Sequence, residues 1–186
     1  MQISALYPDV DSVATSDVIV ISYIALPTIG ESAPEIIFNA HPALVKKIEK
    51  LFAVDLSDEL SFFSPTGKVG ELNEIPVSAP DSAIERIVLL GLGDQSLASY
   101  RSAGATLGRK VRGTDKKFAT LAPNKRDEII AFVTSAFLGH YTWSQKTSLT
   151  VTDPEIEIVT LDAEPVEYAR TIATAICRAR APPPRW

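Results

Sequence analysis

The chain has 186 residues and a net charge of −5, a length that suggests one domain able to bury about 70% of its unfolded surface without a disulfide or metal. Hydrophobic residues make up 46% and charged residues 22%, which is a globular composition and argues against disorder. The single cysteine, Cys177, excludes an internal disulfide. The apolar run over residues 18–26 is about half of the ~20 residues that a membrane span needs. The first eleven residues contain no basic segment of the kind that opens a signal peptide.

Hydrophobic patterning in the first half of the chain predicts a buried strand over residues 17–26, where Val and Ile follow one another almost without interruption. Pro27, Gly30 and Pro34 then break the pattern. Apolar residues at helical spacing predict a helix over residues 42–53. Short strands are predicted on the two sides of the turn at Pro65–Gly67, over residues 61–64 and 70–77.

The second half alternates more clearly between the two kinds of element. The predicted elements are a strand over 87–90, a helix over 96–112, a strand over 118–121, a helix over 125–141 capped by Asn124, a strand over 156–161 and a helix over 164–180. The polar stretch 142–154 is predicted to be a loop. This alternation predicts an α/β protein with a largely parallel sheet and helices on both faces.

Glycines stand at two places where they could carry either structure or function. Gly91-Leu92-Gly93 lies between a strand and a helix, where a dinucleotide-binding turn would sit. Ser96 replaces the third glycine of that motif, however, and Asp94 would repel a phosphate, so a purely structural turn is favoured. Gly104 and Gly108, four residues apart on the apolar face of the next helix, are expected to allow close packing of a neighbouring helix.

Catalytic or metal-binding constellations are not visible in the sequence. The two histidines, His41 and His140, are far apart, and Cys177 has no CxxC partner. The acidic pair Asp58/Glu59 is typical of a solvated surface. There is no GxSxG nucleophile motif. We therefore assign no catalytic, cofactor-binding or metal-ligating residue in this chain.

A short basic stretch is the most unusual feature of the charge pattern. Residues 101–126 contain eight lysines and arginines and one aspartate, whereas residues 1–100 contain five basic and fourteen acidic residues. The stretch is either a surface that binds an anion or a protein partner, or a solvated face that balances the acidic remainder. The candidate surface residues are Arg101, Arg109, Arg112, Lys116, Lys117, Lys125 and Arg126.

Four segments, taken together and in this order, resemble the N-terminal domain of the leucyl (cytosol) aminopeptidases. They are Phe63 with Gly67-Lys68-Val69-Gly70-Glu71, the segment Arg86-Ile87-Val88-Leu89-Leu90-Gly91-Leu92-Gly93, the segment Ala136-Phe137-Leu138-Gly139-His140-Tyr141-Thr142-Trp143, and Ala175-Ile176-Cys177-Arg178-Ala179-Arg180. The resemblance covers residues 60–180 by motif and residues 1–59 by position.

This resemblance implies a macro-domain-like fold, with three layers (α/β/α) and a mixed, mostly parallel sheet, over residues 1–180. The aminopeptidases of this family are cytoplasmic homo-hexamers that remove N-terminal amino acids from peptides with two divalent metals (Mn or Zn). Their metal ligands and catalytic residues all lie in a C-terminal catalytic domain, which would be the partner of this domain and has no counterpart here. Residues 181–186 do not match the family. The chain alone is therefore expected to be inactive and to serve assembly or active-site access.

Two other functions stay open from the sequence. A macro-like fold can bind ADP-ribose-type ligands between its glycine turns, and Gly91-Leu92-Gly93 lies at such a turn. The basic segment 101–126 could instead bind a nucleic acid or an acidic partner, although the acidic total lowers that expectation.

Overall fold

The fold is built on one mixed sheet, seen in a computed structural model that describes residues 1–26, 34–80, 82–121, 123–142 and 153–180. The strands are β1 (Gln2–Leu6), β2 (Val18–Leu26), β3 (Glu35–Phe38), β4 (Leu72–Pro76), β5 (Arg86–Gly91), β6 (Lys117–Thr120) and β7 (Glu155–Val159). Their order in the sheet is β1-β7-β6-β2-β5-β4, and β3 pairs with the carboxyl-terminal half of β2. β1, β7, β6, β2 and β5 are mutually parallel, whereas β3 and β4 are antiparallel to their neighbours.

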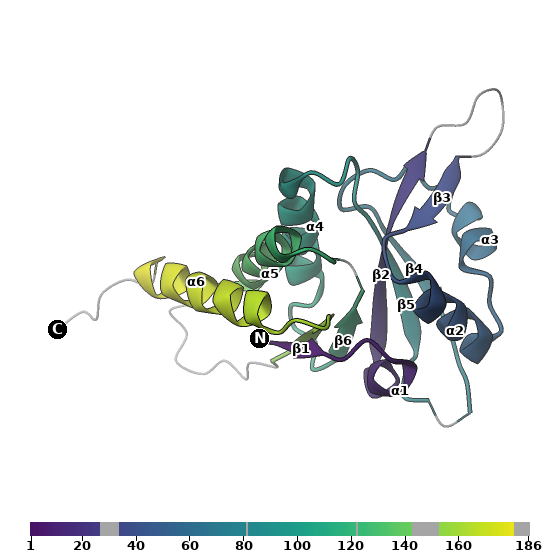
Figure 1. Ribbon diagram of the computed structural model, residues 1–186, viewed down its shortest axis with the longest axis horizontal. Coiled ribbons are helices and arrows are strands. Elements are labelled where there is room, and N and C mark those ends of the chain that lie inside the picture. The colour runs from purple at the N-terminus through teal and green to yellow at the C-terminus, as the bar shows by residue number, and fades with distance from the viewer. Residues whose placement is uncertain (27–33, 81, 122, 143–152, 181–186) are drawn as a thin grey trace.

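Helices cover both faces of this sheet (Figure 1). They are α1 (Val10–Val13), α2 (Pro42–Phe52), α3 (Leu56–Ser61), α4 (Leu97–Lys110), α5 (Arg126–His140) and α6 (Glu164–Arg180). α4, α5 and α6 form one layer, and α1, α2 and α3 lie on the opposite face. The predicted three-layer α/β/α architecture with a mixed, mostly parallel sheet is therefore confirmed. None of the helices within the described ranges is long and apolar enough to cross a membrane.

The central strand β2 has apolar residues on both sides because each side faces a separate core. Val18 and Val20 point into the core beneath α4, α5 and α6. Ile19, Ile21 and Tyr23 point the other way, into the core that α2 and α3 cover. Successive side chains of a strand alternate between its faces, so a strand covered on both sides reads as a continuous apolar run.

Close contact between α4 and α5 depends on three glycines, as expected for two of them. A Cβ atom at Gly104 would overlap the carbonyl oxygen of Phe132, and one at Gly108 would overlap that of Ala136. On the facing helix, a Cβ at Gly139 would meet the main chain of α4 in the same way. The packing interpretation of the spaced glycines is therefore confirmed.

The structure corrects several predicted elements. Residues 61–64 are not a strand, because Asp55 accepts hydrogen bonds from the N–H groups of Ser57 (2.9 Å) and Asp58 (3.0 Å) and so begins α3. β1, α1 and β3 were not expected. Asn124 is not the cap of α5, since the N-cap residue is Lys125. Most of the predicted loop 142–154, and the tail 181–186, lie outside the described residues.

Candidate functional site

A pocket lies at the carboxyl edge of the sheet, where the parallel strands end. Its volume is about 250 Å³. Segments that follow three neighbouring strands contribute to it: Pro8 after β1, Leu121, Pro123 and Asn124 after β6, and Val159 to Asp162 at the end of β7. Ala40 and His41, which join β3 to α2, and Leu44 in the first turn of α2 close the other side. In open α/β sheets, ligands bind at this edge, near the place where the strand order reverses.

The reversal in this sheet lies between β2 and β6. The chain leaves β2 through β3, α2, α3 and β4 to reach β5, with α2 and α3 on one face, and then crosses through α4 on the other face to reach β6. The pocket is lined on one side by residues that follow β6 and on the other by the start of α2. Its position in the topology is therefore that of a ligand site.

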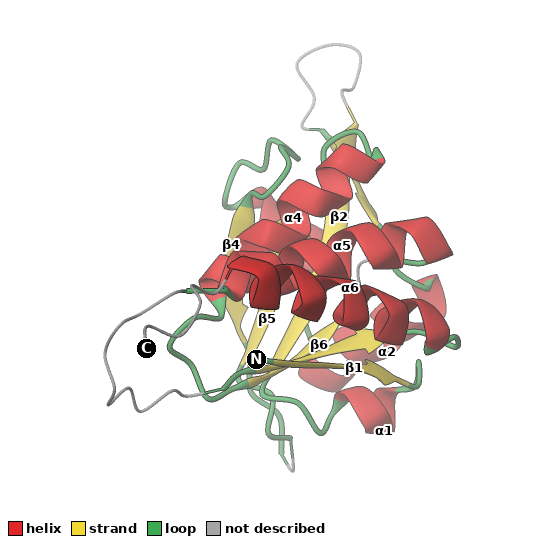
Figure 2. Ribbon diagram, turned by 90° about the vertical axis from the view of Figure 1, so that its left-hand side faces the viewer, coloured by secondary structure: helices red, strands yellow, loops and turns green. Residues whose placement is uncertain are grey.

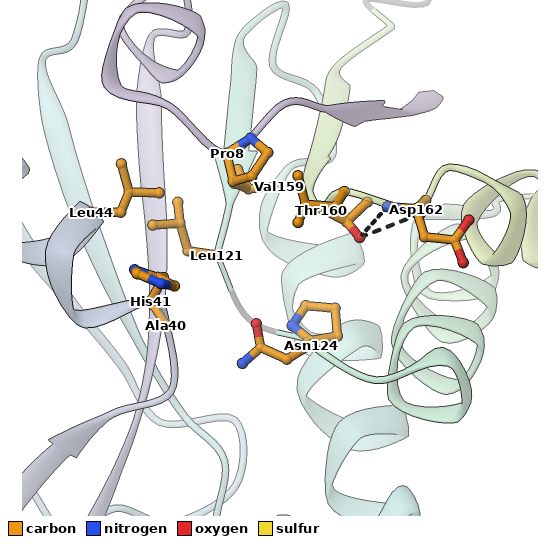
Figure 3. Close-up of a pocket in the computed structure, with 11 residues that line it drawn as sticks. Pro8, Ala40, His41, Leu44, Leu121, Asn124, Val159, Thr160 and Asp162 are labelled. Carbon is orange, nitrogen blue, oxygen red and sulfur yellow. Dashed lines mark hydrogen bonds between the residues drawn. The ribbon is translucent and has the colours of Figure 1, made fainter.

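The walls of the pocket are mainly apolar, and His41, Asn124, Thr160 and Asp162 are its polar lining residues (Figure 3). Leu44, Leu121 and Val159 are buried in the core that α2 and α3 cover, and they line the pocket from that side. The main-chain N–H of Asp162 donates to the Thr160 hydroxyl (3.2 Å), and the Asp162 carboxylate accepts the main-chain N–H of Glu164 at the start of α6 (3.0 Å). These bonds fix the strand-to-helix turn that forms one rim. Apolar walls with a few polar groups are typical of small-molecule sites.

The size of the pocket limits what it could hold. Pockets for drug-sized ligands occupy roughly 300–1,000 Å³, so 250 Å³ suits one ring or one amino-acid side chain. A ligand as large as ADP-ribose would fill it and extend out of its mouth.

A network of exposed and partly buried hydrogen bonds supports the Asn124 side of the pocket. The Asn124 amide donates to Asn39 (3.4 Å), and the Asn39 amide donates to the Tyr100 hydroxyl (2.7 Å). Glu128 accepts from the main-chain N–H groups of Asn124 (3.3 Å) and Lys125 (3.2 Å). Burial alone would raise the pKa of the Glu128 carboxyl, but these bonds and the Lys125 ammonium lower it below its usual value. Glu128 is thus held as a carboxylate that fixes the loop after β6.

The glycines of the turn at residues 91–93 are required by the local structure. A Cβ at Gly91 would overlap the carbonyl oxygen of Lys68, and Gly93 has a φ of +60°. The start of α4 is already occupied, because Asp94 accepts from the Ser96 N–H (3.0 Å) and the Ser99 hydroxyl (2.6 Å). The Ser99 bond is the main reason that the pKa of Asp94 is lowered to about 2. A negative charge from the protein itself therefore stands where a phosphate would have to bind.

The isolated titratable residues do not come together. Burial lowers the pKa of His140 and raises that of the Cys177 thiol, which keeps the thiol protonated. His41 lies at the mouth of the pocket on the other side of the sheet from these two. Among the described residues, no group of three or more His, Cys, Asp or Glu side chains could hold a metal ion.

The seven candidate cations are spread over the molecule rather than gathered on one surface. Lys116 and Lys117 lie at the start of β6, whereas Lys125 and Arg126 follow its end. Four of the seven form ion pairs: Lys116 with Glu85, Lys117 with Glu157 (3.0 Å), Lys125 with Glu128 (3.1 Å) and Arg126 with Glu164 (2.8 Å). Arg126 also lies over the ring of Tyr168, 5.5 Å from its centre.

The remaining three cations belong to α4 and the turn after it. Arg112 donates to the carbonyl oxygens of Gly139 and His140 at the end of α5, a favourable place for a cation. Arg109 donates to the Thr106 hydroxyl (3.0 Å). Arg101 and Arg109 are exposed, and no described carboxylate lies within ion-pair distance of either. Binding of a partner by the seven stays a prediction.

The pocket residues were missed by sequence reasoning, which considered His41 only as an isolated histidine. They lie far apart in the chain and share no motif. Their one common feature is that most of them immediately follow a strand of the parallel sheet. Taking the residues after each predicted strand as a set would have brought Pro123 and Asn124 together with the residues that follow Val159.

Comparison with known proteins gives similarity in structure but not in sequence. No protein-family model matches the chain, and no curated protein matches it. A tomato leucine aminopeptidase variant superimposes with a TM-score of 0.63 at 18% identity, over 95% of this chain and 36% of the aminopeptidase. The bottromycin maturation enzyme BotP gives 0.58 at 16% identity, over 89% of this chain and 32% of BotP.

A macro domain also shares the architecture. The macro domain of ganglioside induced differentiation associated protein 2 superimposes with a TM-score of 0.56 at 10% identity, over 92% of this chain and 84% of that domain. The chain has the fold of a macro domain and of part of a leucine aminopeptidase. It spans about a third of the length of the aminopeptidase and of BotP. At these identities, the likeness concerns the fold alone.

Proposed function

We propose that the chain acts as the non-catalytic N-terminal domain of a leucyl-aminopeptidase-type enzyme, where it serves assembly or access to the active site. The observation that supports this most directly is the superposition of nearly the whole chain on about a third of a leucine aminopeptidase. The four sequence segments that resemble this family agree with it. In this proposal, the two divalent metals and the hydrolytic chemistry belong to a separate catalytic domain, and the working enzyme is a cytoplasmic homo-hexamer.

Isolation of the protein from its natural source tests this role. When the natural protein is captured on an antibody raised against this chain, aminopeptidase activity is expected to be captured with it. The activity is measured as amine release from a leucine anilide with added Mn²⁺ or Zn²⁺. Competition with the purified chain should release both the protein and the activity. Recovery of this chain free of any aminopeptidase activity would contradict the proposal.

A second function, binding of an ADP-ribose-type ligand, is favoured by one specific observation. The pocket lies at the carboxyl edge of the sheet, next to the reversal of strand order, in a chain that has the fold of a macro domain. In this second proposal, the ligand would bind against Ala40, Leu121 and Asn124 and not at the glycine turn, because the carboxylate of Asp94 already occupies the start of α4 there.

Calorimetry with ADP-ribose tests this second function. Heat of binding is expected for the unchanged chain, and it should be lost when Ala40→Trp fills the pocket. Ala43→Trp is the matched control, because Ala43 lies three residues further along, in the first turn of α2, is exposed and does not line the pocket. Absence of heat at high micromolar ligand, or equal heat in both variants, would remove this function.

A further inference from the structure

The two edges of the sheet differ in how they are protected. β4, at one edge, carries Glu74 and Pro76. Charged residues and proline on an edge strand discourage pairing with another chain. β1, at the other edge, has the sequence Gln-Ile-Ser-Ala-Leu and carries neither. β1 is therefore the edge that is suited to receive a further strand.

The main-chain groups that β1 offers can be identified from its pairing with β7. The N–H of Gln2 donates to Pro154 (3.0 Å), and the carbonyl of Leu6 accepts from Thr160 (2.9 Å), so both residues point their main chain toward β7. Main-chain groups alternate in direction along a strand. The N–H and C=O groups of Ile3 and Ala5 therefore point to the open edge, where none of the described strands pairs with them.

A groove accompanies this edge and is bounded by α6. Its volume is about 580 Å³, and it is lined by Met1 to Ser4 on the strand and by α6 residues that include Thr171, Thr174 and Arg178. Figure 2 looks onto this side of the molecule and shows β1 below α6, at the front of the sheet. Any chain that pairs with β1 would therefore also lie beside α6.

The side of α6 that borders the groove has a polarity that favours one particular partner. Arg170, Thr171, Thr174 and Arg178 line the groove. Glu167 extends the stripe of Thr171, Thr174 and Arg178 by one turn toward the start of the helix, because these four residues are spaced four, three and four apart. The stripe begins with an acid, ends with a base and has two small residues between them. Its sequence is therefore complementary to itself when two copies run in opposite directions.

We propose that β1 and α6 form an interface with a second copy of this chain, related by a two-fold axis perpendicular to the sheet. Such an axis pairs β1 with β1 in the antiparallel direction, with Ile3 of one copy opposite Ala5 of the other, and joins the two sheets into one. It also sets the two α6 helices side by side in opposite directions. Glu167 of each copy then faces Arg178 of the other, and Thr171 faces Thr174.

Charge and symmetry both support a second copy over an unrelated peptide. A two-fold interface uses the same surface twice, so each residue contact occurs in duplicate. Arg178 has no carboxylate within ion-pair distance among the described residues, although it borders the groove. In the dimer, Glu167 of the other copy supplies the carboxylate for Arg178. Glu167 is exposed and pairs with Arg170 of its own helix (2.5 Å), so it would share its charge between the two arginines. The interface gives a surface to the assembly role proposed above, on which it rests.

Sedimentation equilibrium of the full chain over a range of concentrations tests the strand pairing. The unchanged chain is expected to dimerise. Ala5→Pro should give a monomer with an unchanged circular dichroism spectrum, because it removes an N–H that points to the open edge and leaves the bonds to β7 in place. Ala5→Ser retains this N–H and should leave the dimer intact.

Charge exchange tests the helix contact independently. Glu167→Arg and Arg178→Glu should each raise the dimer dissociation constant by about tenfold at low salt, since each change affects two symmetric contacts. The double variant Glu167→Arg/Arg178→Glu should restore the original value, which a surface effect of either charge alone would not do. Arg101→Glu, on the exposed side of α4, is the control and should change nothing.

Several outcomes would overturn the interface. These are a monomer at every concentration up to the high micromolar range, a dimer that is indifferent to Ala5→Pro, or a double variant that is weaker than both single variants. None of these results bears on the co-isolation of aminopeptidase activity with the native protein. Failure of the interface and failure of the proposed function are therefore distinguishable.

Discussion

The contact between α4 and α5 allows a prediction whose sign depends on the structure. In an isolated helix, replacing a glycine by alanine stabilises by about 1 kcal/mol. At Gly108 the new methyl group would overlap the carbonyl oxygen of Ala136 and crowd the main-chain nitrogen of His140. Neither atom can turn aside as a side chain could, so the two helices must separate. Overpacking of this kind costs about 1–3 kcal/mol. The cost at Gly108 is expected at the upper end of this range, because the overlapped atoms belong to the main chain.

Gly108→Ala should therefore lower the free energy of unfolding by about 2 kcal/mol, which is the overpacking cost less the gain in helix propensity. Urea unfolding followed by circular dichroism measures this, and the melting temperature should fall by roughly 4–8 °C for a chain of this size. Ser102→Ala, at an exposed position of α4, is the control and should stay within about 0.5 kcal/mol of the original. A Gly108→Ala variant that is more stable than the original chain would refute the close approach of the helices.

Three further substitutions are each expected to weaken one local interaction. Tyr23→Phe leaves the buried amide of Asn73 without the hydroxyl that accepts its hydrogen bond (3.2 Å), so urea unfolding should show a loss of about 1–3 kcal/mol. Asp94→Asn should lower the melting temperature at neutral pH. Because the pKa of Asp94 is lowered to about 2, its stabilisation is present above the unfolded value near 3.9 and is lost as the pH falls through 2, so the two melting curves should converge there. Arg112→Ala should speed amide hydrogen exchange at the end of α5, whose carbonyl groups Arg112 binds, and unchanged exchange would count against that cap.

The major elements of the second half could be predicted because each has a strong local signal. β5 is a compact apolar strand, and α4 begins at Ser96, whose side chain caps it. β1 and β3 could not be found in this way. β1 mixes polar and apolar residues, and only one of its five residues is fully buried. β3 has three consecutive apolar residues, Ile36, Ile37 and Phe38, but it is four residues long and none of them is fully buried. At residues 61–64, two adjacent phenylalanines suggested a strand, but they follow a helix and are exposed.

The candidate site was out of reach for a different reason. Its residues come from four segments separated by up to about 150 positions, and no spacing along the chain reveals such a set. The same holds for the basic stretch. Lys117 pairs with Glu157, forty residues away, because β6 and β7 are neighbours in the sheet. A charge excess in the sequence therefore did not predict a charge excess on one surface.

The most direct test of the central claim is the hydrolytic activity of the purified chain itself. A leucine anilide is incubated with increasing amounts of the chain in the presence of Mn²⁺ or Zn²⁺, and amine release is measured against a blank that contains the metal alone. Because the catalytic residues are proposed to lie in another domain, the rate is expected to equal the blank at every chain concentration. A rate that rises in proportion to the chain concentration and follows the chain through purification would contradict it.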